Sequence, residues 1–198
     1  MDKRNYFNQL APRWDSLPSP PGAPDKIRRF VARAIPEDAR RVLDAGCGTG
    51  VLLPAILDQR PGIELLCELD FAEQMLRLGR CRSSNRAVAA VAADLVRPPL
   101  REEIFDAVLC FGIIPHLADP AAACRELIRR LRRGGRLAVG HLMASHELNA
   151  FHSQLDGPVS SDRLPPAGDL AALLAACGAT PLAAEETPGW YFVLAGRP

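Results

Sequence analysis

Three glycines and one acidic residue follow the first strand-like run closely enough to form a binding loop. The stretch VLDAGCGTG places Asp44 just before Gly46, Gly48 and Gly50. Glycines let a backbone come close to a ligand, and loops between a strand and a helix often hold nucleotides. A dinucleotide site expects the spacing GxGxxG, but Val51 stands at the place of its last glycine. The GxGxG spacing therefore favours a group smaller than a pyrophosphate.

Two more aspartates end the next two apolar runs. Asp70 ends IELLCELD, twenty positions after Gly50, and Asp94 ends AVAAVAAD. Ligands of open parallel sheets bind beyond the carboxyl ends of the strands, and the glycine loop leaves the first strand at that edge. A carboxylate after the second strand is suited to the two hydroxyls of a ribose. Glu68 shares a strand face with Asp70 and is the alternative ribose ligand.

All four histidines follow later apolar runs, and three of them fall within HLMASHELNAFH, residues 141–152. Imidazoles can take a proton or orient a ligand near neutral pH. The candidate catalytic residues are His116, His141 and His146, and the candidate substrate contacts in this stretch are Asn149 and His152. Two other interpretations stay open: a metal site, since three imidazoles suit zinc, nickel or iron, and a solvated helix surface. For His116 the structural alternative is a loop histidine that caps Asp119.

The N-terminal stretch NYFNQLAPRWD has the pattern of a short aromatic helix over residues 3–14. Its Tyr6 and Trp14, together with Phe7, are expected to close over an acceptor and exclude water, so Tyr6 and Trp14 are candidate substrate contacts. The alternative is a helix docked permanently on the sheet. The proline-rich connector SLPSPPGAP separates this helix from the rest. We therefore predict a lid helix with its connector over 1–24 and one domain over 25–198.

These residues stand on alternating strand-like and helical segments, which predict right-handed crossovers and a parallel sheet. Pro188-Gly189 joins the last two runs as an antiparallel hairpin. The predicted fold is α/β: a doubly wound, Rossmann-like, seven-stranded mixed sheet, mostly parallel with the last strand antiparallel, and helices on both faces. Gly134-Gly135 is predicted to end the helix that Asp119-Pro120 opens. The predicted strands are 40–46, 63–70, 87–94, 105–112, 136–141, 181–187 and 190–196, and the predicted helices are 3–14, 25–35, 51–60, 72–82, 120–133 and 166–179.

Three segments between or on these elements carry separate expectations. Residues 142–165 are expected to form an insertion near the acceptor site. The stretch PVSSDRLPPAG, residues 158–168, is interpreted as a surface connector. The basic run RRLRRGGR, residues 129–136, is interpreted as the solvated outer face of a helix.

Composition narrows the class of partner. A net charge of +1 on 198 residues gives no electrostatic footprint for nucleic acid or an anionic membrane. No run approaches the roughly 18 apolar residues of a membrane span, and the N-terminus is too polar for a signal peptide. The six cysteines form no CxxC pair, which favours buried free thiols in a reducing cytoplasm. The oligomeric state is not indicated.

Read in order, the motifs resemble those of class I S-adenosylmethionine-dependent methyltransferases. VLDAGCGTG is similar to the family's first motif, LDFAEQML to its second, and AADL to its third. FDAVLCFGIIPHL resembles the fourth strand and its loop, and RELIRRLRRGGRLAV resembles the helix, turn and fifth strand. Arg133 replaces the usual proline of that turn. The resemblance covers residues 38–142.

The resemblance implies S-adenosylmethionine as cofactor and S-adenosylhomocysteine as product. Backbone N–H groups of residues 46–50 are expected to face the amino-acid end of the cofactor, Asp70 its ribose and Asp94 its adenine. The acceptor side lacks the Asn/Asp-Pro-Pro-aromatic arrangement, which lowers nucleobase and glutamine amide acceptors. The implied cofactor-binding residues are Asp44, Gly46, Cys47, Gly48, Gly50, Asp70, Phe71, Met75, Asp94, Leu95 and Phe111.

The function expected from this resemblance is methyl transfer to a small-molecule O, N, S or C nucleophile. Three alternatives stay open. One is a catalytically silent S-adenosylmethionine binder that acts as a regulatory or partner protein. Another is a metal- or metalloid-handling methyltransferase that uses the histidines of residues 141–152. The third is a nicotinamide-dependent oxidoreductase, against which Val51 argues.

Overall fold

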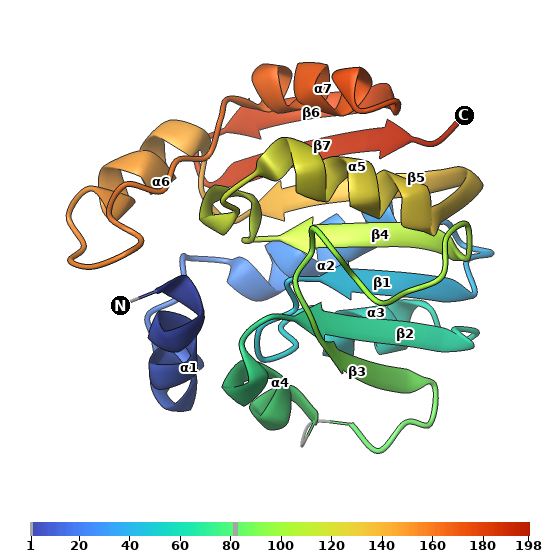
Figure 1. Cartoon of the computed structure of the whole chain (residues 1–198), viewed down its shortest axis with the longest axis horizontal. Helices are drawn as coiled ribbons and strands as arrows, with labels where there is room; N and C mark the ends of the chain where they lie inside the picture. The colour runs from blue at the N-terminus through green and yellow to red at the C-terminus, as the bar shows by residue number, and fades with distance from the viewer. Residues whose placement is uncertain (1, 81–82) are drawn as a thin grey trace.

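Seven strands form one sheet in the part of the chain that the structure describes, residues 2–80 and 83–198 of a computed structural model. Their order is β3-β2-β1-β4-β5-β7-β6 (Figure 1). β7 runs antiparallel to both of its neighbours, and the pairs from β3 to β5 are parallel. The strands are β1 Arg41–Ala45, β2 Leu65–Asp70, β3 Val88–Ala92, β4 Phe105–Phe111, β5 Leu131–His141, β6 Thr180–Thr187 and β7 Trp190–Gly196.

Helices cover both faces of this sheet. In Figure 1, α5 and α7 lie in front of the strands, whereas α2 and α3 lie behind them. The predicted doubly wound, Rossmann-like mixed sheet is therefore confirmed. The helices are α1 Lys3–Trp14, α2 Ala23–Ala34, α3 Leu53–Gln59, α4 Glu73–Arg80, α5 Pro120–Arg130, α6 Ser145–His152 and α7 Ala167–Ala176, with a short 3-10 helix at Ile114–His116.

The central strands are apolar on both faces because both faces are covered. β4 reads FDAVLCF, and all but its last residue are buried. Val108 joins the core under α5 and α7, while its neighbour Leu109 joins the core under α2 and α3. Buried parallel strands show such continuous apolar runs instead of alternation. This pattern leaves the polar residues at the strand ends, where the candidate site lies.

The carboxyl ends of the parallel strands lie beneath two helices. α1 and α6 stand beside the arrowheads of β1, β4 and β5 in Figure 1. α1 packs mainly on α4 through Phe7 and Ala11, which contact Ala72 and Met75. The predicted helix over 3–14 is therefore a helix of this length, placed beside the sheet edge where ligands bind in such folds.

The predicted end of the helix at Gly134-Gly135 is wrong. α5 ends at Arg130, and β5 begins at Leu131, which pairs with Phe105 of β4. The pairing then shifts register before Arg136. Tertiary pairing ends the helix here because Leu131 is fully buried against the sheet. The predicted helix over 72–82 is described only as far as Arg80; Cys81 and Arg82 lie outside the described residues.

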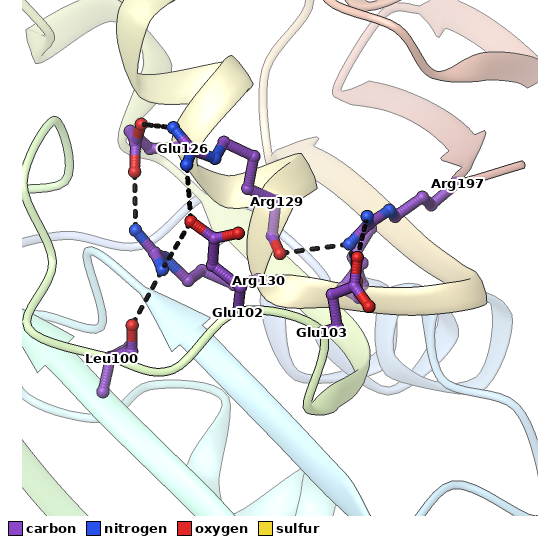
Figure 2. A network of polar contacts seen from close by, with 8 residues as sticks. Leu100, Glu102, Glu103, Glu126, Arg129, Arg130 and Arg197 are labelled. Carbon is purple, nitrogen blue, oxygen red and sulfur yellow. Dashed lines mark hydrogen bonds and ion pairs between the residues drawn. The ribbon is translucent and has the colours of Figure 1, made fainter.

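The basic run 129–136 is also not simply a solvated face. Figure 2 shows a network in which Arg130 donates to Glu126 at 2.6 Å and to the backbone oxygen of Leu100 at 2.8 Å. The Arg130 side chain is only 9% exposed, whereas that of Arg129, which pairs with Glu102, is 56% exposed. This network holds α5 to the loop before β4, at the end of the sheet opposite the candidate site.

None of the helices in the described parts of the chain is long and apolar enough to cross a membrane.

Candidate active site

The glycine loop after β1 has the backbone that its sequence requires. Gly46, Gly48 and Gly50 all have positive φ, which side chains disfavour. A Cβ on Gly46 would lie 2.5 Å from Ile113, so this glycine lets the loop after β4 come close. A Cβ on Gly48 would meet nothing within 4 Å. The backbone at Gly48 therefore borders open space, as a cradle for a ligand would.

The expectation that the N–H groups of residues 46–50 face a cofactor is wrong for most of them. Gly46 and Cys47 donate to the carbonyl oxygen of Leu69, and Gly50 donates to that of Cys47. Gly48 donates to Asp70 Oδ2 at 2.9 Å. These bonds join β1 to β2 and fix the shape of the loop. The loop thus gives the site its shape, and most of its N–H groups are already used within the protein instead of pointing to a ligand.

Asp70 holds this loop in place and is itself buried. Its Oδ1 accepts from the N–H of Ala72 at 2.8 Å, and its Oδ2 accepts from Gly48. Burial raises the pKa of Asp70 above its ordinary value, although these N–H groups and the nearby His116 oppose the rise. Each carboxylate oxygen has two lone pairs, so capacity for ribose hydroxyls remains.

Asp44 lies deeper than Asp70 and is fully enclosed. Among the described residues, its Oδ2 has no hydrogen-bond partner. Burial, followed by repulsion from Glu68 and Asp70, raises the pKa of Asp44 well above its ordinary value. Buried polar atoms are normally paired, so an orphaned oxygen beside the glycine loop fits a ligand that brings a donor.

A cavity of about 370 Å³ lies beside these residues. It opens where the loops after β1, β2, β3 and β4 come together. Lys3 of α1 also lines it, so the cavity reaches the N-terminal helix. Glu68 instead borders a second cavity with Leu53 and Arg80, which favours Asp70 over Glu68 as the ribose ligand. The predicted site residues that line the first cavity are Gly46, Asp70, Phe71, Asp94, Leu95 and His116.

His116 is paired with an aspartate that the sequence did not single out. Its Nδ1 lies 2.6 Å from Asp162 Oδ2, so Asp162, not Asp119, is its partner. Asp119 instead accepts from the N–H of Ala122 and caps α5. Lys3 donates to the other Asp162 oxygen at 2.5 Å and to the backbone oxygen of His116 at 3.0 Å. This arrangement places a histidine–aspartate pair at the wall of the cavity.

Two of the other histidines lie near this pair. The ring of His152 is 5.3 Å from that of His116, and its Nδ1 lies 3.2 Å from the backbone oxygen of Asp162. Burial, then the neighbouring His116 and His152, lowers the pKa of His141 to about 4. His141 is therefore neutral at pH 7, and its Nδ1 accepts from the N–H of Met143.

His146 and Asn149 do not line the cavity. His146 is exposed on α6. Asn149 makes two hydrogen bonds to the backbone of Leu164, which tie α6 to the end of the segment 142–165. Within residues 2–80 and 83–198, no three His, Cys, Asp or Glu residues come together as metal ligands would.

The aromatic residues predicted near the site have mixed positions. The ring of Phe7 lies 5.1 Å from His116 and 6.0 Å from Trp14, and Tyr6 packs on Phe7. Met75 is buried under α1 and does not line the cavity. Phe111 packs on Phe30 behind the sheet. Tyr6 and Trp14 thus support Phe7 more directly than they face the cavity.

Sequence reasoning missed Lys3, Asp162 and a link between Asp15 and the glycine loop. Thr49 donates to Asp15 Oδ1 at 2.7 Å, which joins the end of α1 to the loop. Asp162 belongs to the stretch interpreted as a surface connector, but Val159, Asp162 and Leu164 are all buried. The only sign of this burial in the sequence is that two apolar residues, Val159 and Leu164, stand on either side of Asp162.

Known proteins resemble this chain in sequence. Residues 43–139 match the methyltransferase domain family. A demethylmenaquinone methyltransferase from Thermus thermophilus is 35% identical over 139 residues, which cover 67% of this chain and 62% of that protein. The chain thus spans less than two thirds of the length of such curated relatives.

Solved structures show the same fold at low identity. A chain in the complex between the Haloferax volcanii Trm112 methyltransferase activator and a methyltransferase has a TM-score of 0.82 and 17% identity, covering 100% of this chain and 99% of that one. The Haemonchus contortus phosphoethanolamine N-methyltransferase 2, solved with phosphomonomethylethanolamine and S-adenosylhomocysteine, has a TM-score of 0.76 and 15% identity. That match covers 99% of this chain and 58% of the other.

The sheet order and the acids after β1, β2 and β3 define a Rossmann-like nucleotide-binding fold of the class I methyltransferase type. With the matches above, the chain belongs to the family of class I S-adenosylmethionine-dependent methyltransferases. The residues present fit that cofactor, because Gly46, Asp70 and Asp94 line one cavity. Gly48, whose backbone borders open space, donates to Asp70, and the orphaned Asp44 oxygen belongs to the strand that leads into this loop.

Proposed function

We propose that this protein transfers the methyl group of S-adenosylmethionine to a small-molecule acceptor. One observation carries the proposal: a single cavity of about 370 Å³ is lined both by five of the predicted cofactor residues, Gly46, Asp70, Phe71, Asp94 and Leu95, and by His116 and Lys3. A sulfonium supplies an activated methyl group, so the protein mainly has to align the acceptor and exclude water.

Residues of this chain divide into two ends of that cavity. Asp70 is proposed to accept from the ribose and Asp94 from the adenine amino group, with Leu95 and Phe71 against the ring. Asp44 is proposed to accept from the amino group of the cofactor. At the other end, Ile113, Leu117 and His116 are proposed to contact the acceptor. The lining there is mostly apolar, which supports an uncharged organic molecule with one reactive polar group.

The relatives support a small organic acceptor. The Thermus protein is named for a quinone precursor, and the Haemonchus structure holds a small phosphorylated amine. The net charge of +1 supports a small molecule over nucleic acid. The five described cysteines are free thiols, which supports a reducing cytoplasm as the place of action.

Calorimetric titration tests the cofactor half of this proposal. S-adenosylhomocysteine is expected to bind the full chain, and NADH in a parallel titration is not. Asp70→Ala and Asp94→Ala should each weaken binding at least about tenfold, the worth of one hydrogen bond to a charged group. Asp58→Ala, an exposed aspartate of α3, is the matched control and should bind normally.

Two results would overturn the proposal. Binding of NADH without S-adenosylhomocysteine would favour an oxidoreductase. Tight binding of S-adenosylhomocysteine with no methyl transfer to any acceptor of a broad screen of phenols, quinols, amines and thiols would favour a silent binder. Asp94→Ala is included as a second test because Asp70 also accepts from the backbone N–H groups of Gly48 and Ala72, which shape the loop. Asp94 accepts from neither of them, so its replacement leaves those bonds in place.

A further inference from the structure

The strongest unassigned feature is the carboxylate of Asp162, which lies between the ammonium of Lys3 and the imidazole of His116. It lies on the segment that joins α6 to α7, 46 residues from His116 and 159 residues from Lys3 along the chain. Its side chain is only 5% exposed. Burial would raise the pKa of Asp162, but the hydrogen bonds from His116 and Lys3 outweigh burial and lower it. Asp162 is therefore ionised at neutral pH.

An ionised carboxylate at 2.6 Å decides which ring nitrogen of His116 carries the proton. A carboxylate only accepts hydrogen bonds, so Nδ1 of His116 must be the donor. In the neutral ring, Nε2 then holds the lone pair. The ring lines the cavity, and Nδ1 is already used by Asp162. Nε2 is thus the nitrogen left for an acceptor.

We propose that Asp162 is a positioning residue that holds His116 with Nε2 unprotonated and available to the acceptor's proton. This inference rests on the proposed function. The electron pair of the acceptor's X–H bond forms the new bond to the methyl carbon, the electron pair of the C–S bond stays on sulfur, and the proton passes to His116 Nε2. One positive charge thus leaves the sulfonium and appears on the imidazolium, beside Asp162.

The neighbouring histidine provides a contrast within the same protein. His141 Nδ1 accepts from the N–H of Met143, so the proton of its neutral ring lies on Nε2. The two rings therefore have opposite tautomers, and only His116 has its Nδ1 bound to a carboxylate. Lys3 occupies the other oxygen of that carboxylate, so α1 must be docked for Asp162 to have both partners.

Nitrogen-15 spectroscopy of the free protein tests this directly. In long-range proton–nitrogen spectra, with His116→Gln used for assignment, the neutral His116 ring should show protonated Nδ1 and unprotonated Nε2. In Asp162→Asn the proton is expected to move to Nε2. Asp156→Asn, an exposed aspartate of the same segment, is the matched control and should leave the tautomer unchanged. Lys3→Met should also keep Nδ1 protonated, because the His116–Asp162 bond remains.

Activity provides the second readout. Asp162→Asn should lower kcat roughly 10²-fold or more, the usual worth of a general base, with little change in KM. Its affinity for S-adenosylhomocysteine should stay at the wild-type value. In Asp162→Asn the remaining oxygen can still accept from Lys3 while the NH2 group faces Nδ1. If that variant fails to fold, the double variant Lys3→Met/Asp162→Leu removes both charges, offers Nδ1 no acceptor at this position and takes its place.

The failures are distinguishable. A wild-type His116 with its proton on Nε2, or an Asp162→Asn variant with the wild-type tautomer, would overturn the positioning role even if the cofactor binds. Absence of S-adenosylhomocysteine binding to the wild type would overturn the proposed function while the tautomer measurement still stands.

Discussion

At the residue scale, the candidate site combines buried carboxylates that folding alone would not favour. Asp44 lies at the end of β1 just before the glycine loop, Glu68 and Asp70 lie on the paired strand β2, and all three are buried. Their mutual repulsion contributes to the raised pKa of Asp44. Such a cluster costs stability, and its natural compensation is a ligand that brings hydrogen-bond donors.

Asp44→Asn is therefore expected to stabilise the free protein. Because the folded-state pKa of Asp44 is raised, its ionisation destabilises the native state as pH rises above the ordinary aspartate value of 3.8. The variant should gain about 1–3 kcal/mol at pH 7 and nothing below about pH 4. Urea unfolding at both pH values measures this, with Asp58→Asn as the exposed control.

The same Asp44→Asn variant should bind S-adenosylhomocysteine more weakly than the wild type. A stabilised protein with weaker binding would show that this carboxylate serves the ligand. A loss of stability at pH 7 would instead mean that the carboxylate is paired and ionised in the native state.

At the element scale, each end of the sheet has its own means of holding helices. At the site end, α1 is held by Lys3 near its beginning, by Phe7 and Ala11 in its middle, and by Asp15 just after its last residue. At the other end, the arginine network of Figure 2 joins α5 to the loop before β4. The first set joins α1 to α4, to the glycine loop and to the segment before α7, whereas the second includes a buried arginine.

Two adjacent arginines of α5 should differ in their contribution to stability. Arg130→Ala removes a nearly buried guanidinium that donates to Glu126 and Leu100, and should cost about 2 kcal/mol. Arg129→Ala removes an exposed ion pair and should cost less than about 1 kcal/mol. Urea unfolding of the two variants checks this, and equal losses would contradict the burial argument.

At the scale of the whole molecule, the ligand site joins segments that are distant in the chain. The N-terminal helix, the loops after four strands and the segment before α7 all meet at the carboxyl edge of the sheet. A ligand in that place contacts most of the fold at once. Its binding should therefore stabilise the native state as a unit.

Ligand-dependent melting measures this effect. At a concentration of S-adenosylhomocysteine 100 times its Kd, the native state gains about 2.7 kcal/mol, which should raise Tm by roughly 5–11 °C for a chain of this size. Asp70→Ala, if its binding is weakened about tenfold, should gain only about 1.4 kcal/mol at the same concentration, so its Tm should rise about half as much or less. A wild-type Tm that does not respond to the ligand would contradict the proposed site.

The features that could be predicted from the sequence are those that depend on local patterns of residues. Strand and helix periodicity, together with the alternation of elements, was enough for the seven-stranded sheet. Asp70 was predicted at the site because strand ends meet at one edge, and Asp94 and Leu95 because of the family resemblance; all three line the cavity, and their roles toward the cofactor stay predictions. Where tertiary contacts decide, prediction failed: α5 ends at Arg130 because Leu131 pairs with Phe105, which no local pattern shows.

The second half of the site could not be predicted from spacing. His116 was a candidate, but its partners Lys3 and Asp162 come from two other parts of the chain, and no motif relates the three. Asp162 stands in a stretch rich in serine and proline that is typical of surface loops. Only the folded structure shows that this stretch turns inward beneath α1.

One side chain of the glycine loop bears on how the protein withstands oxidation. Cys47 stands between two of the loop glycines, where a reactive thiolate would expose the cofactor site to peroxide and alkylating reagents. Burial, with the nearby Asp44, Glu68 and Asp70, raises the pKa of Cys47 well above the ordinary thiol value. Only the thiolate reacts readily, so this sulfur stays inert at neutral pH. Burial, together with the acidic cluster that costs the fold stability, thereby keeps the loop thiol from reacting. Oxidants should therefore modify the half-buried Cys177 before Cys47.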